Sequence, residues 1–243
     1  MTAQVLLNHF YVTPDRASFE AVEASAFMQR FGALEKRTTV RKDTTYTGLY
    51  LYGESTYLEL LHPDSASFGA ASGIAYAVEE RGAIHGVCQA LAAQPRTVSR
   101  GEVPWFLSCE PQQRMQALAE WAMEYLPAFF AGFHPELPPA HAGISRGDAL
   151  TRYAASCGKL REREQGLFGD VMALELRLGR EDLAVWKSRP LRLGGVEVQA
   201  LPAEDRSGIL SARLRLRRDA GKSVEQLGKT TLTLDGRTAV WRF

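Results

Sequence analysis

The chain has 243 residues, of which 45% are hydrophobic and 23% charged, as is usual for a globular protein with a sizeable core. Lys and Arg number 29 and Asp and Glu 28, so the formal net charge of +1 excludes a general electrostatic attraction to nucleic acid or anionic membranes. No apolar run reaches the roughly 18 residues of a transmembrane helix, and the N-terminal residues lack a signal-peptide pattern.

The first part of the chain, residues 1–65, predicts a β-α-β-β-β module. Residues 5–12 (VLLNHFYV) are typical of a strand, and a helix is expected over 18–31, with Ser18 as its N-cap and Gly32 at its end. Three β-rich runs follow at 34–41, 45–52 and 56–62, and the tetrapeptide GEST at 53–56 is typical of a hairpin connection.

The middle of the chain, residues 66–169, predicts a shortened β-α-β unit with additional helices. The expected elements are a strand at 73–79, a helix at 82–93, a strand pair at 96–109 and helices at 112–131 and 145–157. The first of the two later helices is broken near Pro127, because proline removes a backbone donor. The Pro- and Gly-rich residues 132–143 predict a loop.

The last part, residues 170–243, is predicted to repeat the β-α-β-β-β order of the first. We expect a strand at 171–178, a helix at 180–188 and strands at 195–201, 209–217, 230–234 and 238–243. The three modules are expected to form one compact unit. The three cysteines, Cys88, Cys109 and Cys157, are far apart, odd in number and lack a CxxC pair, so we expect no disulfide framework and a reducing, cytoplasmic compartment.

Two stretches, LLNHFYVTPD at 6–15 and YLYGESTYLELLHP at 50–63, resemble the vicinal oxygen chelate superfamily of glyoxalase I, extradiol dioxygenases and bleomycin-resistance proteins. The stretches TTVRKDTTYTGLYLYG, VPWFLSCEP, WAMEYLPAF and TAVWRF are similar to a bacterial group of glyoxalase-like proteins. The resemblance implies an α+β fold in which paired βαβββ modules form curled mixed sheets around a cavity, with an elaborated helical middle.

The resemblance also implies that His9 on the first strand and Glu59 on the fourth bind a divalent metal inside the cavity. Imidazole and carboxylate suit Fe, Mn, Zn or Ni, and an open position would let two substrate oxygens chelate the metal. Strand alternation puts His9 on a face with Leu7 and Tyr11, and Glu59 on a face with Tyr57 and Leu61. From the residues alone, a hydrogen-bonded histidine and a solvent-facing glutamate remain the alternative.

The C-terminal module does not supply the remaining metal ligands, because the matching positions fall on or near Ala173 and Trp241, and the histidine position of the middle unit falls near Ala75. The candidates for a third ligand are Glu110, which we prefer, Glu124, His134 and Cys109. Three alternatives remain: a ligand from the partner subunit of a homodimer, a cavity that has lost its metal, and a protonated His9 that pairs directly with Glu59.

Two functions are therefore expected. The first is a metal-dependent lyase, isomerase or dioxygenase acting on a small oxygenated metabolite, with no catalytic residue assigned. The second is a metal-free protein that binds or sequesters a small molecule. In both, the ligand is small and neither nucleic acid nor membrane is a partner, and no GxGxxG or P-loop predicts a nucleotide cofactor. The expected cavity-lining residues, whose aromatic members also fit a core, are Tyr11, Tyr50, Tyr57, Trp105, Glu124 and Trp241.

Overall fold

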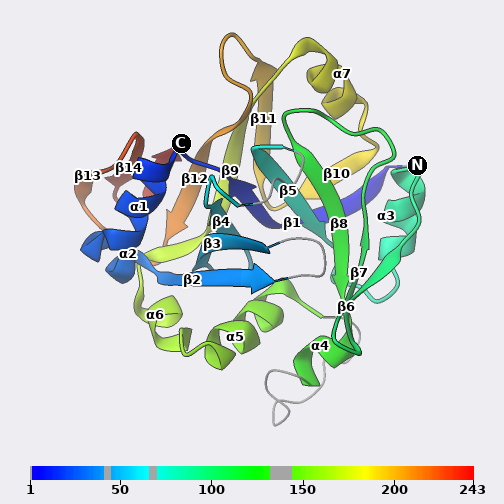
Figure 1. Ribbon diagram of the computed structural model, residues 1–243, viewed down its shortest axis with the longest axis horizontal. Helices are drawn as coiled ribbons and strands as arrows, with labels where there is room; N and C mark the ends of the chain where they lie inside the picture. Colours follow the sequence, from blue (N-terminus) through cyan, green and yellow to red (C-terminus); the bar gives the residue numbers. More distant parts are fainter. Residues whose placement is uncertain (1, 41–44, 66–69, 132–143) are drawn as a thin grey trace.

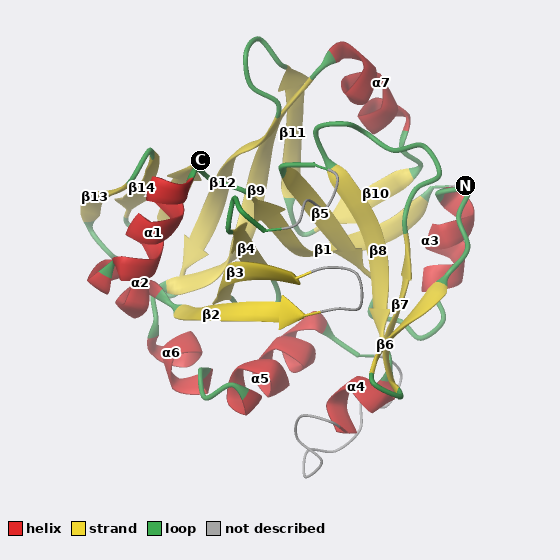
Figure 2. Ribbon diagram, viewed as in Figure 1, coloured by secondary structure: helices red, strands yellow, loops and turns green. Residues whose placement is uncertain are grey.

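The computed structural model describes residues 2–40, 45–65, 70–131 and 144–243 and consists of two β-sheets with helices packed around them (Figures 1 and 2). The nine-stranded sheet has the strand order β2-β3-β4-β1-β5-β8-β7-β6, and β10 also pairs with β1. The six-stranded sheet has the order β11-β9-β12-β15-β14-β13. The predicted α+β class with curled sheets is confirmed.

The first unit of the nine-stranded sheet has the predicted β-α-β-β-β order. Its elements are β1 (Ala3–Val12), α1 (Arg16–Ala24), α2 (Ala26–Phe31), β2 (Ala33–Val40), β3 (Thr45–Tyr52) and β4 (Tyr57–Leu61). The helix expected over 18–31 is instead two short helices. Asp15, not Ser18, caps the first by accepting a hydrogen bond from the Ser18 N–H, and the Ser25 side chain interrupts the pattern by capping the second.

The middle of the chain is a complete second β-α-β-β-β unit, not the shortened one that was expected. Its elements are β5 (Ser72–Ala77), α3 (Ile84–Ala90), β6 (Arg96–Arg100), β7 (Val103–Cys109) and β8 (Ala119–Tyr125). The strand order β5-β8-β7-β6 repeats the order β1-β4-β3-β2 of the first unit. Antiparallel pairing of β1 with β5, with His9 opposite Ala75, joins the two units edge to edge.

The helix predicted over 112–131 is wrong. The structure has strand β8 there, followed by the short helix α4 (Pro127–Ala131). Strand β8 is buried on both faces. Ala122 packs in the main core, whereas Met123 and Tyr125 pack in a smaller cluster on the opposite face. Burial on both faces between β5 and β7 overrides the helical pattern. The loop expected at 132–143 lies outside the described residues.

The C-terminal part does not repeat the first unit, which corrects the predicted module at 170–243. Its elements, after α5 (Arg146–Ser156) and α6 (Leu160–Gln165), are β9 (Phe168–Leu178), α7 (Arg180–Ser188), β10 (Leu191–Gly194), β11 (Glu197–Pro202), β12 (Gly208–Leu216), β13 (Lys222–Leu227), β14 (Thr230–Asp235) and β15 (Thr238–Arg242). Strand β9 lies between parallel β11 and antiparallel β12, whereas β10 joins the other sheet. Strands β10 and β13 were not predicted.

One large hydrophobic cluster joins the two sheets. It contains Phe10 and Leu58 from the nine-stranded sheet together with Leu174, Leu214 and Trp241 from the six-stranded sheet, so the described parts share a core. The indole N–H of the fully buried Trp241 donates to Thr230 Oγ1 over 3.2 Å.

Polar contacts add a second connection between the sheets, at the turn between β3 and β4. The carboxylate of Asp170 at the start of β9 accepts hydrogen bonds from the backbone N–H and the hydroxyl of both Ser55 and Thr56. Gly53 is required in this turn, because a Cβ there would lie 2.6 Å from the carbonyl oxygens of Gly169 and Thr56.

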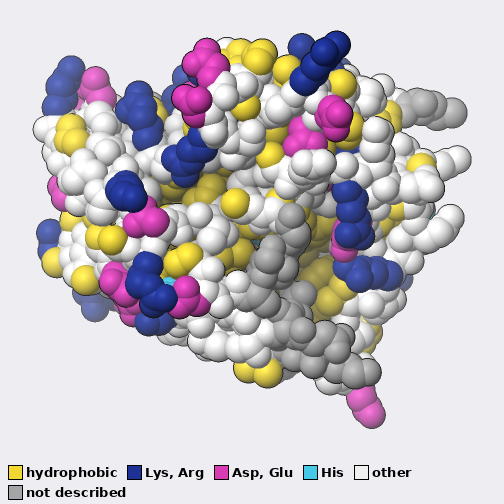
Figure 3. Space-filling view, turned by 45° about the horizontal axis from the view of Figure 1, so that its top comes forward, with side chains coloured by type: hydrophobic (Ala, Val, Ile, Leu, Met, Phe, Trp, Pro, Cys, Tyr) yellow, Lys and Arg dark blue, Asp and Glu magenta, His cyan; other side chains and the backbone are white. Residues whose placement is uncertain are grey.

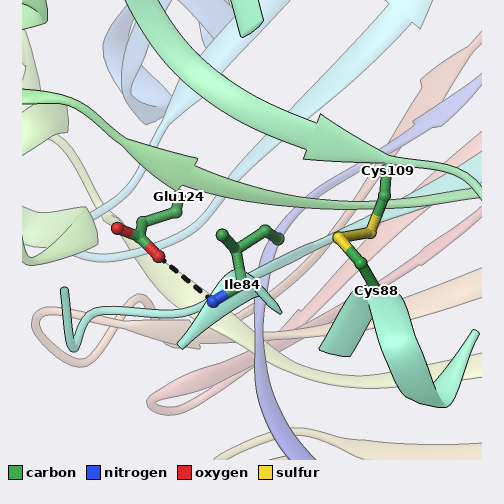
Figure 4. The surroundings of a disulfide bond; sticks show 4 residues. All are labelled: Ile84, Cys88, Cys109 and Glu124. Atoms are coloured by element: carbon green, nitrogen blue, oxygen red, sulfur yellow. Dashed lines mark hydrogen bonds between the residues drawn. A yellow bond between two sulfur atoms is a disulfide. The ribbon is translucent and has the colours of Figure 1, made fainter. Parts of the chain in front are cut away.

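Cys88 of α3 and Cys109 at the end of β7 form a disulfide, although the spacing of the cysteines did not suggest one (Figure 4). Only Cys157 is free among the cysteines. Spacing along the chain did not indicate the pair, because the helix and the strand are brought together only by the fold. No helix in the described ranges is long and apolar enough to cross a membrane.

Candidate functional site

A cavity of about 950 Å³ lies on the face of the nine-stranded sheet that carries His9 and Glu59. Both βαβββ units contribute to its wall, and Ala149, Leu150 and Tyr153 of α5 close one side. The space-filling view shows hydrophobic side chains deep in a hollow that has charged side chains around it (Figure 3). The predicted sharing of a cavity between the first and last modules is therefore wrong, because the middle unit takes the place of the last.

Strand alternation places the predicted residues as expected. His9 and Tyr11 on β1 and Glu59 on β4 line the cavity, whereas Phe10 and Leu58 point into the main core. The parallel register sets His9 beside Tyr57 and Tyr11 beside Glu59. His9 Nε2 lies 3.6 Å from Glu59 Oε1, which confirms the predicted approach of these two side chains.

A β-bulge turns Asn8 toward His9. In the pairing with β5 the register shifts between Leu7 and His9, so Asn8 is the extra residue of the bulge. The Asn8 Nδ2 group donates to the Tyr125 hydroxyl over 3.2 Å, and its Oδ1 lies 2.7 Å from His9 Nδ1. In this arrangement Nδ1 carries the proton and donates to Asn8, which leaves Nε2 as an acceptor that faces Glu59.

The environment keeps His9 neutral. Burial, assisted by the positive charge of Arg37, lowers the pKa of His9 to about 3. Its ring stacks on Tyr57 with centroids 4.2 Å apart, and it meets Trp121 edge-on at 5.2 Å. The lowered pKa favours a neutral His9 over the alternative of a protonated His9 that pairs with Glu59.

The charge of Glu59 reaches several tyrosines. Burial first, and then the Glu59 carboxylate, raises the pKa values of Tyr11, Tyr50 and Tyr57 above the usual range. Burial and the same carboxylate also outweigh a hydrogen bond from Asn8 and raise the pKa of Tyr125 to about 12. These hydroxyls stay protonated at neutral pH.

Three of the expected lining residues lie elsewhere. Tyr50 is fully buried beneath the surface of the cavity, and Trp241 is in the main core. Glu124 accepts hydrogen bonds from the N–H groups of Gly82 and Ile84 at the start of α3 (Figure 4). Tyr11, Tyr57 and Trp105 line the cavity as predicted. The prediction missed further lining residues, namely Arg37, Tyr52, Trp121, Tyr125 and Tyr153. Alternation along β2 and β8 could have indicated Arg37 and Trp121.

The described residues do not complete a metal site. Glu110, our preferred third ligand, forms ion pairs with Arg96 at 2.6 Å and Arg114 at 2.8 Å. In the described ranges no group of three or more His, Cys, Asp or Glu side chains could hold a metal ion, whereas catalytic zinc commonly has three protein ligands. Glu124 and Cys109 have the other partners given above, and His134 lies outside the described residues.

The second βαβββ unit does not supply the metal ligands that the first unit lacks. Its parallel register sets Ala75 beside Trp121 and Ala77 beside Met123, as the first unit sets His9 beside Tyr57 and Tyr11 beside Glu59. Ala75 pairs with His9 across the junction of the two units and is its counterpart in the second unit. By the same register, Met123 is the counterpart of Glu59. Neither alanine nor the soft thioether of methionine suits a hard divalent metal.

A family model described as "Family of unknown function (DUF5829)" matches residues 7–243. The chain belongs to the DUF5829 family. The match includes both βαβββ units and the six-stranded sheet, so the cavity of this DUF5829 protein lies within the matched region. The comparison with curated proteins found no match.

Proposed function

We propose that this DUF5829 protein binds a small organic molecule in the cavity of the nine-stranded sheet without a resident metal. The observation that carries the proposal is the matched register of the two βαβββ units. Where the first unit has His9 and Glu59, the second has Ala75 and Met123. A site with two protein donors favours a hydrogen-bonded ligand over a tightly held cation.

The lining of the cavity supports a flat ligand. Small-molecule sites commonly have volumes of about 300–1,000 Å³ and are lined by aromatic side chains with a few polar groups, and this cavity of about 950 Å³ fits that description. Tyr57 and Trp121 offer ring surfaces beside His9. The acceptor Nε2 of His9 and the carboxylate of Glu59 would bind a hydroxyl or N–H group of the ligand.

A second candidate is the metal-dependent enzyme that the resemblance to the vicinal oxygen chelate superfamily implies. It is favoured by the 3.6 Å approach of His9 Nε2 to Glu59 Oε1, and by Asn8, which fixes the other ring nitrogen as in many metal-binding histidines. A divalent Fe, Mn, Zn or Ni ion held there would act as a Lewis acid on a small oxygenated substrate, in a lyase, isomerase or dioxygenase reaction.

Metal analysis separates the two candidates. The protein is purified without a histidine tag or chelator, and its metal content is measured beside native mass spectra of wild type and Glu59→Gln. If binding is metal-free, neither protein should contain a stoichiometric metal. A co-purified or added organic ligand should then bind more weakly to Glu59→Gln than to wild type. A stoichiometric divalent metal in wild type that is lost in Glu59→Gln would instead support the enzyme.

We keep the predicted cytoplasmic location, the absence of nucleic acid and membrane partners, and the homodimer as proposals. The Cys88–Cys109 disulfide argues against the cytoplasmic location, because disulfides form and persist mainly in oxidising compartments.

A further inference from the structure

Arg37 is a cationic side chain that faces the cavity from β2. Its guanidinium carbon lies 4.0 Å from the centroid of the Tyr50 ring and 5.0 Å from that of Tyr153. Stacking on aromatic rings uses the flat faces of a guanidinium and leaves the N–H groups in its plane available for acceptors. The rings therefore hold Arg37 in place without satisfying its hydrogen-bond donors.

No strong carboxylate partner neutralises Arg37 in the described part of the chain. Its ion pair there is with Glu35, and the distance of 3.7 Å between Nη1 and Oε2 is longer than a hydrogen bond. Glu35 in addition accepts a hydrogen bond from the Tyr52 hydroxyl. A bidentate contact between Arg and a carboxylate, which is the strong form of this interaction, is absent among these described residues.

The Tyr50 ring beneath Arg37 is held in place by the core. Tyr50 is fully buried and does not line the cavity, so a ligand in the cavity contacts Arg37 and not this hydroxyl. Gly48 makes room for this ring, since a Cβ there would lie 3.2 Å from Tyr50 and 3.3 Å from Leu61.

We propose that the ligand of this cavity is an aromatic carboxylic acid whose carboxylate binds Arg37 while its opposite polar end faces His9 and Glu59. This inference rests on the proposed binding of a small molecule. A single guanidinium matches the fork of a carboxylate. A phosphate dianion fits less well, because Glu59 lines the cavity and Glu35 lies 3.7 Å from Arg37, and both carboxylates would repel a second negative charge.

The charges also set the orientation of the ligand. A carboxylate near Glu59 would meet a like charge, whereas a carboxylate at Arg37 meets a cation. Arg37 on β2 and Glu59 on β4 are separated by the single strand β3, so the two polar ends of the cavity lie roughly 10 Å apart, a span that one small molecule can bridge. The aromatic ring of the ligand would lie between these ends, among the rings of Tyr52, Tyr57 and Trp121.

Fluorine NMR on matched pairs of compounds tests the inference with the full-length protein. The probes are 4-fluorobenzoate, 4-fluorophenylacetate and 3-(4-fluorophenyl)propanoate, each beside its uncharged primary amide. For wild type we expect at least one acid to bind roughly tenfold more tightly than its amide, the size expected of a charge-assisted hydrogen bond. In Arg37→Gln this preference should disappear while the amide binds as before, which shows that the cavity is still folded.

Two further variants complete the design. Arg37→Lys keeps the charge but loses the planar fork, so the preference for the acid should be reduced and not abolished. Arg213→Gln removes an exposed arginine that pairs with Glu197 on the other sheet, and the preference should be unchanged. Equal binding of acid and amide to wild type, or a preference that survives Arg37→Gln, overturns the inference and leaves metal-free binding standing. Failure of every acid and every amide to bind overturns both.

Discussion

His9 is a neutral imidazole that is costly to protonate in the folded protein, and this predicts a pH dependence of stability. The pKa falls from 6.5 in the unfolded chain to about 3 in the fold, so below pH 6.5 the unfolded state binds more protons. The contribution of His9 to stability is complete above pH 6.5 and declines as the pH falls from there toward 3, by up to about 1.4 kcal/mol per pH unit.

Urea unfolding of chelator-treated protein between pH 7.5 and pH 5 measures this effect. His9→Gln should be less sensitive to pH than wild type over this interval, and His85→Gln, at an exposed position of α3, serves as the control. An identical pH dependence in wild type and His9→Gln would show that His9 does not carry a depressed pKa.

Single residues were predictable where they follow strand alternation. His9 and Glu59 were placed correctly, because from these residues onward both strands alternate and have apolar residues on the opposite face. The expected place of Leu7 beside His9 is wrong, since the bulge at Asn8 puts Leu7 in the main core. Asn8 was missed because a bulge breaks the period, and only the pairing with β5 shows where the extra residue lies. Trp241 was misplaced because its partner strands belong to another sheet.

At the scale of elements, the disulfide ties α3 to the end of β7. The two cysteines are 21 residues apart, and closing a loop of this length stabilises a fold by about 3 kcal/mol in the chain-entropy account. We expect the double variant Cys88→Ala/Cys109→Ala to unfold at a lower denaturant concentration, with a loss of this order.

Reducing agent provides the matched test of the disulfide. Dithiothreitol should destabilise wild type and a Cys157→Ala control but leave the double variant unchanged, and thiol titration of wild type under denaturing conditions should count one free cysteine before reduction. A count of three in freshly isolated protein would contradict the disulfide.

Helices and strands were predicted best where one pattern was unambiguous. Helix α7 (Arg180–Ser188) was predicted at its observed bounds. Strand β8 was read as a helix, because its apolar residues serve two buried faces and so do not alternate with polar ones. Strand β13 is largely exposed and has no apolar period to detect.

At the scale of the whole molecule, the shared core predicts that the nine-stranded sheet cannot fold without the last part of the chain. Removal of residues 166–243 exposes Phe10 and Leu58 to water and removes Asp170, which anchors the turn between β3 and β4. A fragment of residues 1–165 should therefore lack dispersed methyl signals in its NMR spectrum.

Co-expression of the missing fragment, residues 166–243, should restore a folded complex. A variant of that fragment with Asp170→Ala should restore it less well, because the turn loses its anchor. A well-dispersed spectrum from residues 1–165 alone would show that the two sheets fold independently.

The arrangement of units could be predicted only in part. The count of strands and helices indicated repetition, but a pattern along one chain does not state which strand edges meet. Two β-α-β-β-β orders were therefore assigned to the ends of the chain, whereas the second complete unit is β5 to β8. Strand β10 was not predicted, because its four residues are too few to show a period.

One edge of β1 pairs with two different strands, and this affects when the strand can be completed during synthesis. The half of this strand that precedes the bulge pairs with β10, where Leu6 meets Gly194, and the half that follows pairs with β4. A ribosome adds roughly 5–20 residues per second, so the half of β1 that precedes the bulge waits on the order of ten to forty seconds for β10 to complete this edge, whereas β5 is available to the other edge much earlier. Until then its open edge is available to other chains, which makes the newly made N-terminal segment a natural client for a chaperone on the ribosome.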